Sequence, residues 1–341
     1  INTCIACNQA CLDHVFQNRR ASCLVNPRAC HETELKIEPA SLRKRIAVIG
    51  AGPAGMACAS TLGERGHAVT LIDQANEIGG QFNVAKQIPG KEEFHETLRY
   101  FRHRLEDVGV EVRLGQLADA TTVREGGYDE VVIATGITPR KVSFPGSDDP
   151  RVLGYLDVLA RHQPVGARVA VIGAGGIGFD VAEFLVEHLL SPTTDVARWT
   201  REWGVDMELR QRSGLQAPQP EPPARQVWLL QRSEGRPGAR LNKTTGWVHR
   251  ATLKAKRVSM LGKVGYERFD DQGLHVTVDG KAQILPVDNV VICAGQEPNR
   301  RLADELIAAG ITVHVIGGAD VAAELDAKRA IDQGTRLASR I

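Results

Sequence analysis

The chain has 341 residues, a formal net charge of +1 and 43% hydrophobic residues. Because basic and acidic residues are nearly equal in number, the charge predicts binding neither to nucleic acid nor to anionic membranes. No apolar run approaches the roughly 18 residues of a membrane span, so we expect a soluble, cytoplasmic protein.

The first 43 residues are polar and rich in cysteine. Four thiols follow the pattern C-x2-C-x3-C-x11-C, and they are Cys4, Cys7, Cys11 and Cys23. This crowding is unlike a secreted disulfide scaffold. The spacing favours an iron–sulfur cluster and leaves zinc or disulfides as alternatives. Rival ligands are Cys30, His14 and His31. Since no Met precedes Ile1, we expect this chain to be part of a longer protein.

From Lys44 onward the pattern predicts a parallel sheet covered on both faces. RIAVIGAGPAGMACASTLGERGHAVTLID reads as strand 46–49, a glycine turn, a helix and strand 68–72. The turn residues are Gly50, Gly52, Pro53, Ala54 and Gly55. In such a turn the backbone approaches a pyrophosphate at the positive end of the helix. Asp73 ends the second strand, where a carboxylate accepts hydrogen bonds from ribose hydroxyls.

The stretch that follows Asp73 contains a second glycine loop, Gly79-Gly80-Gln81-Phe82. We expect this loop to run over the phosphates and ribityl chain of a flavin, the alternative being a plain turn. A helical pattern covers 92–108, and YDEVVIATG ends a further strand in a glycine turn at Gly136.

The strand–turn–helix scheme returns near residue 167, with Gly173, Gly175 and Gly178 in the turn. Here the next strand ends in Arg232-Ser233 rather than in an acid. Arginine can pair with a 2′-phosphate, so this site is predicted to prefer NADPH, the alternative being a solvated surface loop.

Two further segments lie in this part of the chain. Residues 190–225 are predicted to form an insertion that is part helical. Residues 243–250 are predicted to form a turn followed by a helix start, and we assign no role to them.

VDNVVICAGQEPN then echoes YDEVVIATGITP, and a final helix covers 327–340. The repeat predicts an α/β fold with two nested Rossmann-like, three-layer dinucleotide-binding domains. We expect a Cys-rich cluster-binding segment (1–43), a discontinuous FAD-binding domain (44–145 and 288–341) and an NADP-binding domain (146–287).

A flavin can accept a hydride and release single electrons, so it belongs between NADPH and a cluster. No CxxxxC predicts a redox disulfide, and hydride transfer between bound cofactors requires no catalytic side chain.

Long stretches carry a family resemblance: CIACNQACLD, SCLVNPRACHE, EIGGQFNVAKQIPGKEEF, NKTTGWVHR, DNVVICAGQEPNR and GGADVAAELDAKRAIDQGTRLA. They resemble the C-terminal part of bacterial NADPH-dependent 2,4-dienoyl-CoA reductases, which are related to trimethylamine and histamine dehydrogenases. The resemblance implies a fatty acid β-oxidation enzyme with the relay NADPH, FAD, 4Fe-4S cluster, FMN and dienoyl-CoA. It further implies an upstream FMN-containing (β/α)8 barrel of the same polypeptide, absent here, as the partner.

Carried over by position, the resemblance assigns roles to individual residues. The implied cluster ligands are Cys4, Cys7, Cys11 and Cys23. The implied FAD contacts are Ala54, Asp73, Gln81, Lys91, Ala118, Asp320 and Ala327. Arg232 and Ser233 fall on the NADP-selecting turn. Two alternatives stay open: an amine-dehydrogenase-like protein with ADP in the first site, and a nucleotide-binding module with structural zinc.

Overall fold

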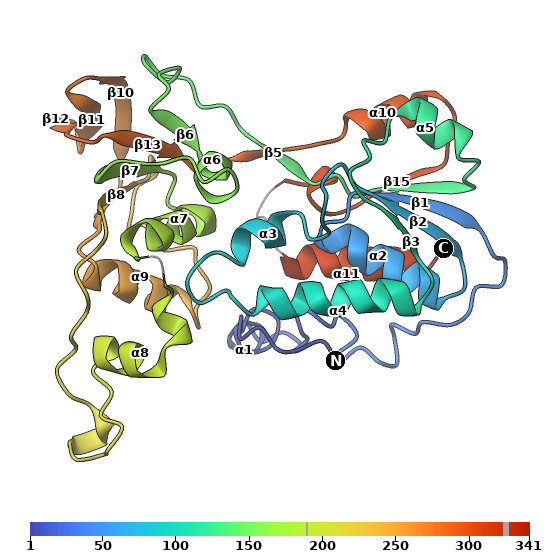
Figure 1. Cartoon of the computed structure of the whole chain (residues 1–341), viewed down its shortest axis with the longest axis horizontal. Coiled ribbons are helices and arrows are strands. Elements are labelled where there is room, and N and C mark those ends of the chain that lie inside the picture. The colour runs from blue at the N-terminus through green and yellow to red at the C-terminus, as the bar shows by residue number, and fades with distance from the viewer. Residues whose placement is uncertain (189, 323–326) are drawn as a thin grey trace. The chain divides into compact units, whose positions relative to one another are not determined.

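The computed structural model describes residues 1–188, 190–322 and 327–341, and it divides the chain into two compact units (Figure 1). The first unit is Ile1–Asn83, Glu93–Thr138 and Gln296–Ile341, and the second is Val84–Glu92 and Pro139–Gly295. Residues 323–326, within the stretch GGADVAAELDAK, lie outside the described residues. The predicted α/β fold with Rossmann-like parallel sheets is confirmed.

The first unit is built on a parallel sheet with helices on both faces. Its strands, in spatial order, are β15 (Val313–Val315), β4 (Glu130–Ile133), β1 (Arg45–Ile49), β2 (Ala68–Ile72) and β3 (Glu111–Arg113). One face packs on α2 (Pro53–Glu64), α4 (Phe94–Asp107) and α11 (Ala327–Ala338). The other packs on α5 (Ala120–Glu125) and α10 (Arg301–Ala308). Ile46 and Val48 face the first core, whereas Ala47 and Ile49 face the second, as the period of a strand requires.

The second unit has a parallel sheet of the same kind. Its strands, in spatial order, are β6 (Val152–Gly154), β13 (Asn289–Ile292), β7 (Arg168–Ile172), β8 (Gln226–Leu230) and β9 (Ser259–Leu261). One face packs on α6 (Tyr155–Leu159), α7 (Gly176–Val186) and α9 (Gly246–Ala255). The other face is covered by an antiparallel sheet of β10 (Val264–Asp270), β11 (Gly273–Val278) and β12 (Lys281–Leu285). The sequence analysis did not predict this sheet.

Shorter elements complete both units. In the first unit α1 (Leu12–Phe16) follows the cysteine loop, and β5 (Ile137–Pro139) pairs with β14 (Gln296–Pro298) where the chain passes between the units. The chain also passes from the first unit to the second within helix α3 (Gln81–Ala85), between Asn83 and Val84. The insertion is part helical, as predicted, with α8 (Val196–Trp203) and 3-10 turns at Pro192–Thr194 and Arg212–Gly214.

The observed units differ from the predicted boundaries at three places, of which the first is residues 139–145, expected in the first domain but part of the second unit. Strand β13 pairs with β6 and β7, so residues 288–295 belong to the second unit rather than to the first. Residues 84–92, expected in the first domain, also join the second unit, because Ile88 is buried in its core. Strand pairing decides the assignment of residues 288–295 and burial of Ile88 that of residues 84–92, and a local sequence pattern reports neither.

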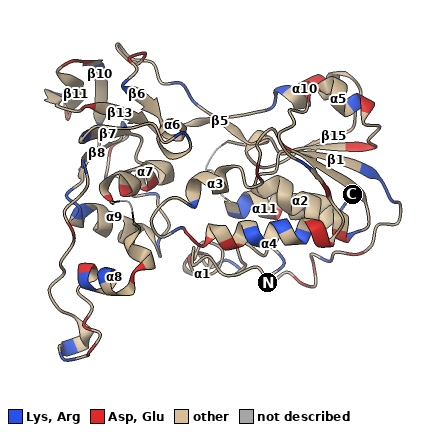
Figure 2. Ribbon diagram, in the orientation of Figure 1, with Lys and Arg blue, Asp and Glu red and all other residues tan. Residues whose placement is uncertain are grey.

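Charged residues of both signs are interspersed along the chain, and α4 shows this clearly (Figure 2). This mixing fits the formal net charge of +1. Of the helices in the described part of the chain, none is both long and apolar enough to cross a membrane.

Candidate functional site

The first glycine turn lies between β1 and α2, and its three glycines have different reasons to be glycine. Gly50 has φ +109°, and a Cβ there would overlap the carbonyl of Ala134. A Cβ on Gly55 would overlap the carbonyl oxygen of Gly50. A Cβ on Gly52, in contrast, would meet no atom within 4 Å, and the φ of Gly52 is an ordinary −77°. The fold therefore requires the outer glycines, whereas the middle one leaves open space at the start of α2.

Asp73 is held directly against this turn. Its Oδ2 accepts a hydrogen bond of 2.6 Å from the backbone N–H of Ala51, and its Oδ1 accepts one of 2.8 Å from Ala75. The backbone N–H of Gln116 donates to the Asp73 carbonyl at 3.0 Å, which brings the segment leading to Ala118 to the same place. A carboxylate with two oxygens has lone pairs left to accept further hydrogen bonds.

The second glycine loop also packs on the first turn. The N–H of Gly79 donates to the carbonyl of Ala51 at 2.8 Å, and a Cβ on Gly80 would lie 3.0 Å from the Cα of Gly52. Both glycines have positive φ, +126° and +52°, and α3 then begins at Gln81. Residues predicted from two separate motifs thus meet beside the open space at Gly52.

Residues 317–320, near the C-terminus, pack against the first glycine turn from another side. A Cβ on Gly317 would lie 2.8 Å from the Cβ of Ala54, and one on Gly318 would lie 3.1 Å from the carbonyl carbon of Gly136. The Asp320 carboxylate follows at once and accepts a 2.8 Å hydrogen bond from Gln333 Nε2. Ala327 begins α11, which lies beside α2 (Figure 1).

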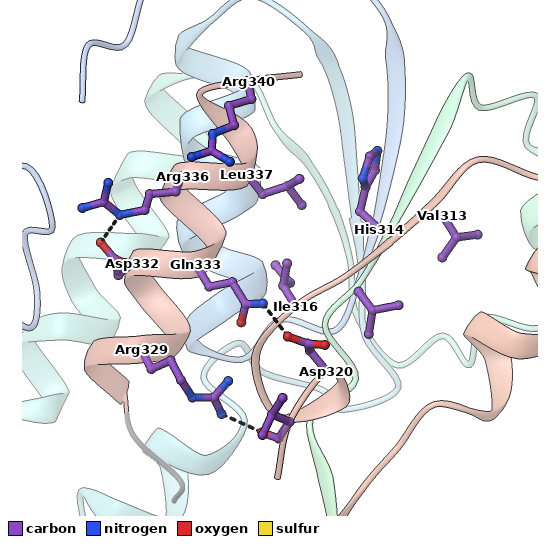
Figure 3. A pocket seen from close by; sticks show the side chains of 12 residues that line it. Val313, His314, Ile316, Asp320, Arg329, Asp332, Gln333, Arg336, Leu337 and Arg340 are labelled. Carbon is purple, nitrogen blue, oxygen red and sulfur yellow. Dashed lines mark hydrogen bonds and ion pairs between the residues drawn. The ribbon is translucent and has the colours of Figure 1, made fainter. Parts of the chain in front are cut away.

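A cavity of about 770 Å³ runs along β15 and α11 (Figure 3). Asp320 and Arg329 lie toward one end, and Arg340 lies toward the other. Of the predicted cofactor residues, only Asp320 lines this cavity.

In the second glycine turn, between β7 and α7, the outer glycines are again required by close contacts and the middle ones are not. Gly173 has φ +111°, and a Cβ there would lie 2.8 Å from the carbonyl oxygen of Cys293. A Cβ on Gly178 would overlap the carbonyl oxygen of Gly173. A Cβ on Gly175 or Gly176 would meet no atom within 4 Å. The second unit therefore also has open space at the N-terminal end of its first long helix.

The turn after β8 is exposed and basic. Arg232, Arg236 and Arg240 carry the charge, and Ser233 lies beside the first of them. In the described part of the chain, none of these three guanidinium groups pairs with a carboxylate. Glu234, the acid nearest in sequence, is 3.1 Å from Lys263. The turn thus presents unpaired positive charge to solvent.

Three of the four N-terminal thiols, Cys4, Cys11 and Cys23, lie within electrostatic range of the fourth, Cys7. Burial and, to a smaller extent, the charges of Cys11, Cys23 and Cys4 raise the pKa of Cys7 to about 11, although a backbone hydrogen bond from Gln9 opposes the shift. The backbone N–H of Ala6 points at Cys4 Sγ, 3.3 Å away, and Ala6 has a strained φ of +52°. Over the ranges that the structure describes, no three His, Cys, Asp or Glu side chains are arranged to hold a metal ion.

The rival ligands have other partners. The His14 ring bonds to the Arg20 carbonyl at 2.8 Å and to Lys328 Nζ at 3.2 Å. His31 lies 3.3 Å from Glu34, and Cys30 is exposed. All seven cysteines are free thiols.

A row of four charged groups in the second unit escaped the sequence analysis. Lys91 Nζ donates to both carboxylate oxygens of Asp180, at 2.7 and 2.6 Å. His249 Nδ1 lies 2.7 Å from Glu183 Oε1. Asp180 and Glu183 share one face of α7, because residues three apart on a helix are neighbours. We call these four groups the charge row. Two acids inside the otherwise apolar helix GIGFDVAEFLV were the signal that the sequence offered.

Comparison with known proteins gives a consistent picture. The family model described as pyridine nucleotide-disulphide oxidoreductase matches residues 44–329. A metal reductase from Desulforamulus reducens is 32% identical over 324 residues, which are 94% of this chain and 47% of that protein. An NADH oxidase from Thermoanaerobacter brockii is 31% identical over 326 residues, 94% of this chain and 45% of that protein.

Among solved structures, a complex of 2-naphthoyl-CoA reductase with 2-naphthoyl-CoA superposes with a TM-score of 0.84 and 26% identity. The match covers 99% of this chain and 46% of that one. The chain thus spans about half the length of the curated relatives that it matches over 94% of its own residues.

Proposed function

The chain belongs to the pyridine nucleotide-disulphide oxidoreductase family, which implies binding of FAD and NAD(P)H, and from this premise we propose a specific electron path. The proposal is that the chain takes a hydride from NADPH onto FAD and passes single electrons to a 4Fe-4S cluster. FAD supplies the conversion from two-electron to one-electron chemistry when it is bound.

The observation that carries the proposal is the pair of glycines that the fold itself does not require. A side chain at Gly52 or Gly175 would meet no protein atom within 4 Å. Each lies at the N-terminus of a helix, where backbone N–H groups and the helix dipole attract phosphate. Two such sites in two units support two dinucleotides rather than one.

In the first unit the residues around the turn suit FAD. Asp73 is oriented by two backbone N–H groups and can accept hydrogen bonds from the ribose hydroxyls. The loop at Gly79 and Gly80 suits close approach of an extended chain of phosphates, because neither residue carries a side chain. Asp320 and the start of α11 would offer a carboxylate and a helix N-terminus to a polar portion of the flavin.

In the second unit the exposed arginines support NADPH over NADH. A 2′-phosphate would gain charge-assisted hydrogen bonds from Arg232 and its neighbours, and no acid ends β8 to repel it. The similarity to an NADH oxidase instead favours NADH as the donor. The donor preference is therefore the part of the proposal that a direct titration has to decide.

The N-terminal loop suits a cluster better than a single ion. Cys7 and the three thiols within its electrostatic range, one of which accepts a backbone N–H, match the ligand type of a 4Fe-4S cluster. Each thiolate of such a cluster binds a different iron, so the thiols stand farther apart than the ligands of one metal ion. Structural zinc is the alternative, and iron analysis separates the two.

We further propose that the whole protein is a reductase of the 2,4-dienoyl-CoA type, with an FMN barrel as the electron acceptor. The structural likeness to a reductase with a CoA thioester bound supports this substrate class. Three apolar side chains of α1 that follow Cys11 are exposed, and they are Leu12, Val15 and Phe16. A surface of this kind beside a redox centre suits the docking of another domain.

The test is an anaerobic titration of the purified chain, reconstituted with FAD and with iron and sulfide. We expect about four irons per chain. NADPH should bleach the flavin and cluster absorbance at lower concentration than NADH. Zinc without iron would overturn the cluster, equal bleaching by NADH would overturn the donor preference, and no bleaching by either nucleotide would overturn the path as a whole.

A further inference from the structure

The two edge strands of the first-unit sheet, β3 and β15, differ in their charges. An open strand edge can pair with another chain, and proteins often prevent this with charged side chains or a covering element. At one edge, β3 reads Glu-Val-Arg, and Glu111 and Arg113 form an exposed ion pair of 2.9 Å. At the other edge, β15 reads Val-His-Val, and its only ionisable side chain, His314, lies 2.6 Å from Glu130 of the neighbouring strand. The edge at β15 thus lacks the protection seen at β3.

The backbone of β15 has free hydrogen-bonding groups on the side away from β4. Backbone hydrogen bonds at Thr312 and Ile316 join this segment to β4, at 3.0 and 2.9 Å. The parallel register makes His314, between them, the third residue that bonds to β4. The N–H and C=O groups of Val313 and Val315 therefore point away from β4. Among the residues that the structure describes, none forms a hydrogen bond with these four groups.

The cavity along β15 and α11 lies at this open edge (Figure 3). Val313 and Val315 line it although their side chains pack into the core on the opposite face of the sheet, so their backbones border the cavity. On the other wall, α11 contributes Arg336, Leu337 and Arg340. The volume of about 770 Å³ is within the range of about 300–1,000 Å³ that is typical of ligand pockets. A groove between an open strand edge and a helix can take up an extended peptide as an added strand.

The charges at one end of the cavity favour an acidic peptide. Arg340 is exposed and forms no ion pair or hydrogen bond within the described part of the chain. Arg336 donates from Nε to Asp332 at 2.7 Å, which leaves its terminal N–H groups for another acceptor. The second acid of the cavity, Asp320, lies toward the opposite end together with Arg329. The end at Arg340 therefore offers charge-assisted hydrogen bonds to a carboxylate.

We propose that β15 and α11 form a docking groove for an extended acidic segment of a partner protein. The segment adds to the sheet as a strand, through the free backbone groups of Val313 and Val315. Side chains of a strand alternate between its two faces, so one set meets Arg336 and Arg340 and the other lies beside the two valines. Acidic residues fit the first set and β-branched residues fit the second. The groove lies wholly in the first unit, and this inference does not rest on the proposed function.

Fluorescence polarisation of labelled peptides with the full chain tests the groove. The probes are the peptide Glu-Val-Glu-Val-Glu-Val and its charge-reversed form Lys-Val-Lys-Val-Lys-Val. We expect the acidic peptide to bind about tenfold or more tightly than the basic one. Arg340→Glu should weaken binding of the acidic peptide about tenfold or more, whereas Arg102→Glu should leave it within about twofold. Arg102 is the matched control, because it is exposed on α4 and does not line the cavity.

Two further measurements report on strand addition itself. Methylation of every second backbone nitrogen of the acidic peptide removes the N–H groups along one of its edges. One of the two alternate sets should abolish binding, and the other should leave it within about twofold, because only one edge of an added strand faces β15. In NMR of the full chain, the acidic peptide should slow hydrogen exchange of the Val313 and Val315 amides about tenfold or more and leave that of His314 unchanged.

Several results would overturn the docking groove. They are equal binding of the acidic and basic peptides, unchanged affinity in Arg340→Glu, and equal effects of the two N-methylated sets. Slow exchange of the Val313 and Val315 amides before any peptide is added would also overturn it, because the edge would then already be covered, by the chain itself or by a second copy.

Discussion

The residue that reports most directly on ligand binding is Gly52. Its φ of −77° is accessible to alanine, and an added methyl group would meet no protein atom within 4 Å. In Gly52→Ala without FAD we therefore expect unfolding free energy equal to the unchanged chain or about 0.4–1 kcal/mol higher. FAD affinity should fall about tenfold or more, equivalent to about 1.4 kcal/mol, because the methyl would occupy the approach of the pyrophosphate. Calorimetric titration of FAD into the flavin-free protein measures the effect.

Gly55→Ala is the matched control in the same turn. Its methyl would overlap the carbonyl of Gly50, so we expect a loss of stability of about 1–3 kcal/mol whether or not FAD is present. If Gly52→Ala bound FAD as tightly as the unchanged chain does, the space at this turn would not be the pyrophosphate site.

At the scale of elements, a buried group of charges joins α7, α8 and α9. Lys256, which follows the last residue of α9, is 2% exposed, and its Nζ lies 2.9 Å from Glu187 and 3.5 Å from Glu202. Arg198 of α8 lies 3.1 Å from Glu187 and 3.3 Å from Glu202. The ammonium and Glu187 are close enough to attract, but their angle is not that of a hydrogen bond. The insertion is thus attached to the second unit by charge as well as by packing.

Removing the central cation of this group should be costly. Lys256→Met leaves two buried carboxylates with one cation fewer, so we expect the unfolding free energy to fall by about 3–5 kcal/mol. Lys254→Met, on the exposed face of α9, should change it by less than about 0.5 kcal/mol. Urea unfolding followed by circular dichroism compares the two variants. Equal stability in both would mean that the buried charges contribute nothing net to holding the insertion.

For the whole molecule, local patterns were enough to predict the two glycine-turn units, because strand, turn and helix are contiguous in sequence. Asp73 and the glycine loop at residue 79 were likewise found from motifs, and the structure brings them together. The charge row was missed because Lys91 and His249 are far apart in sequence and meet α7 only through folding. The antiparallel sheet was missed although Asp279-Gly280, both with positive φ, forms the two-residue turn between β11 and β12, a pair of residues typical of hairpins.

The last test concerns residues 84–92, where the observed units differ from the predicted boundary. Phe82 is buried in the core of the first unit, and Ile88, only six residues later, is buried in the core of the second. Truncating either side chain should cost about 2–5 kcal/mol locally. We therefore expect Ile88→Ala to speed amide hydrogen exchange in β7 and β8, and Phe82→Ala to speed it in β1 and β2, as measured by mass spectrometry. If Ile88→Ala loosened β1 and β2 instead, residues 84–92 would belong to the first unit, as the sequence analysis had placed them.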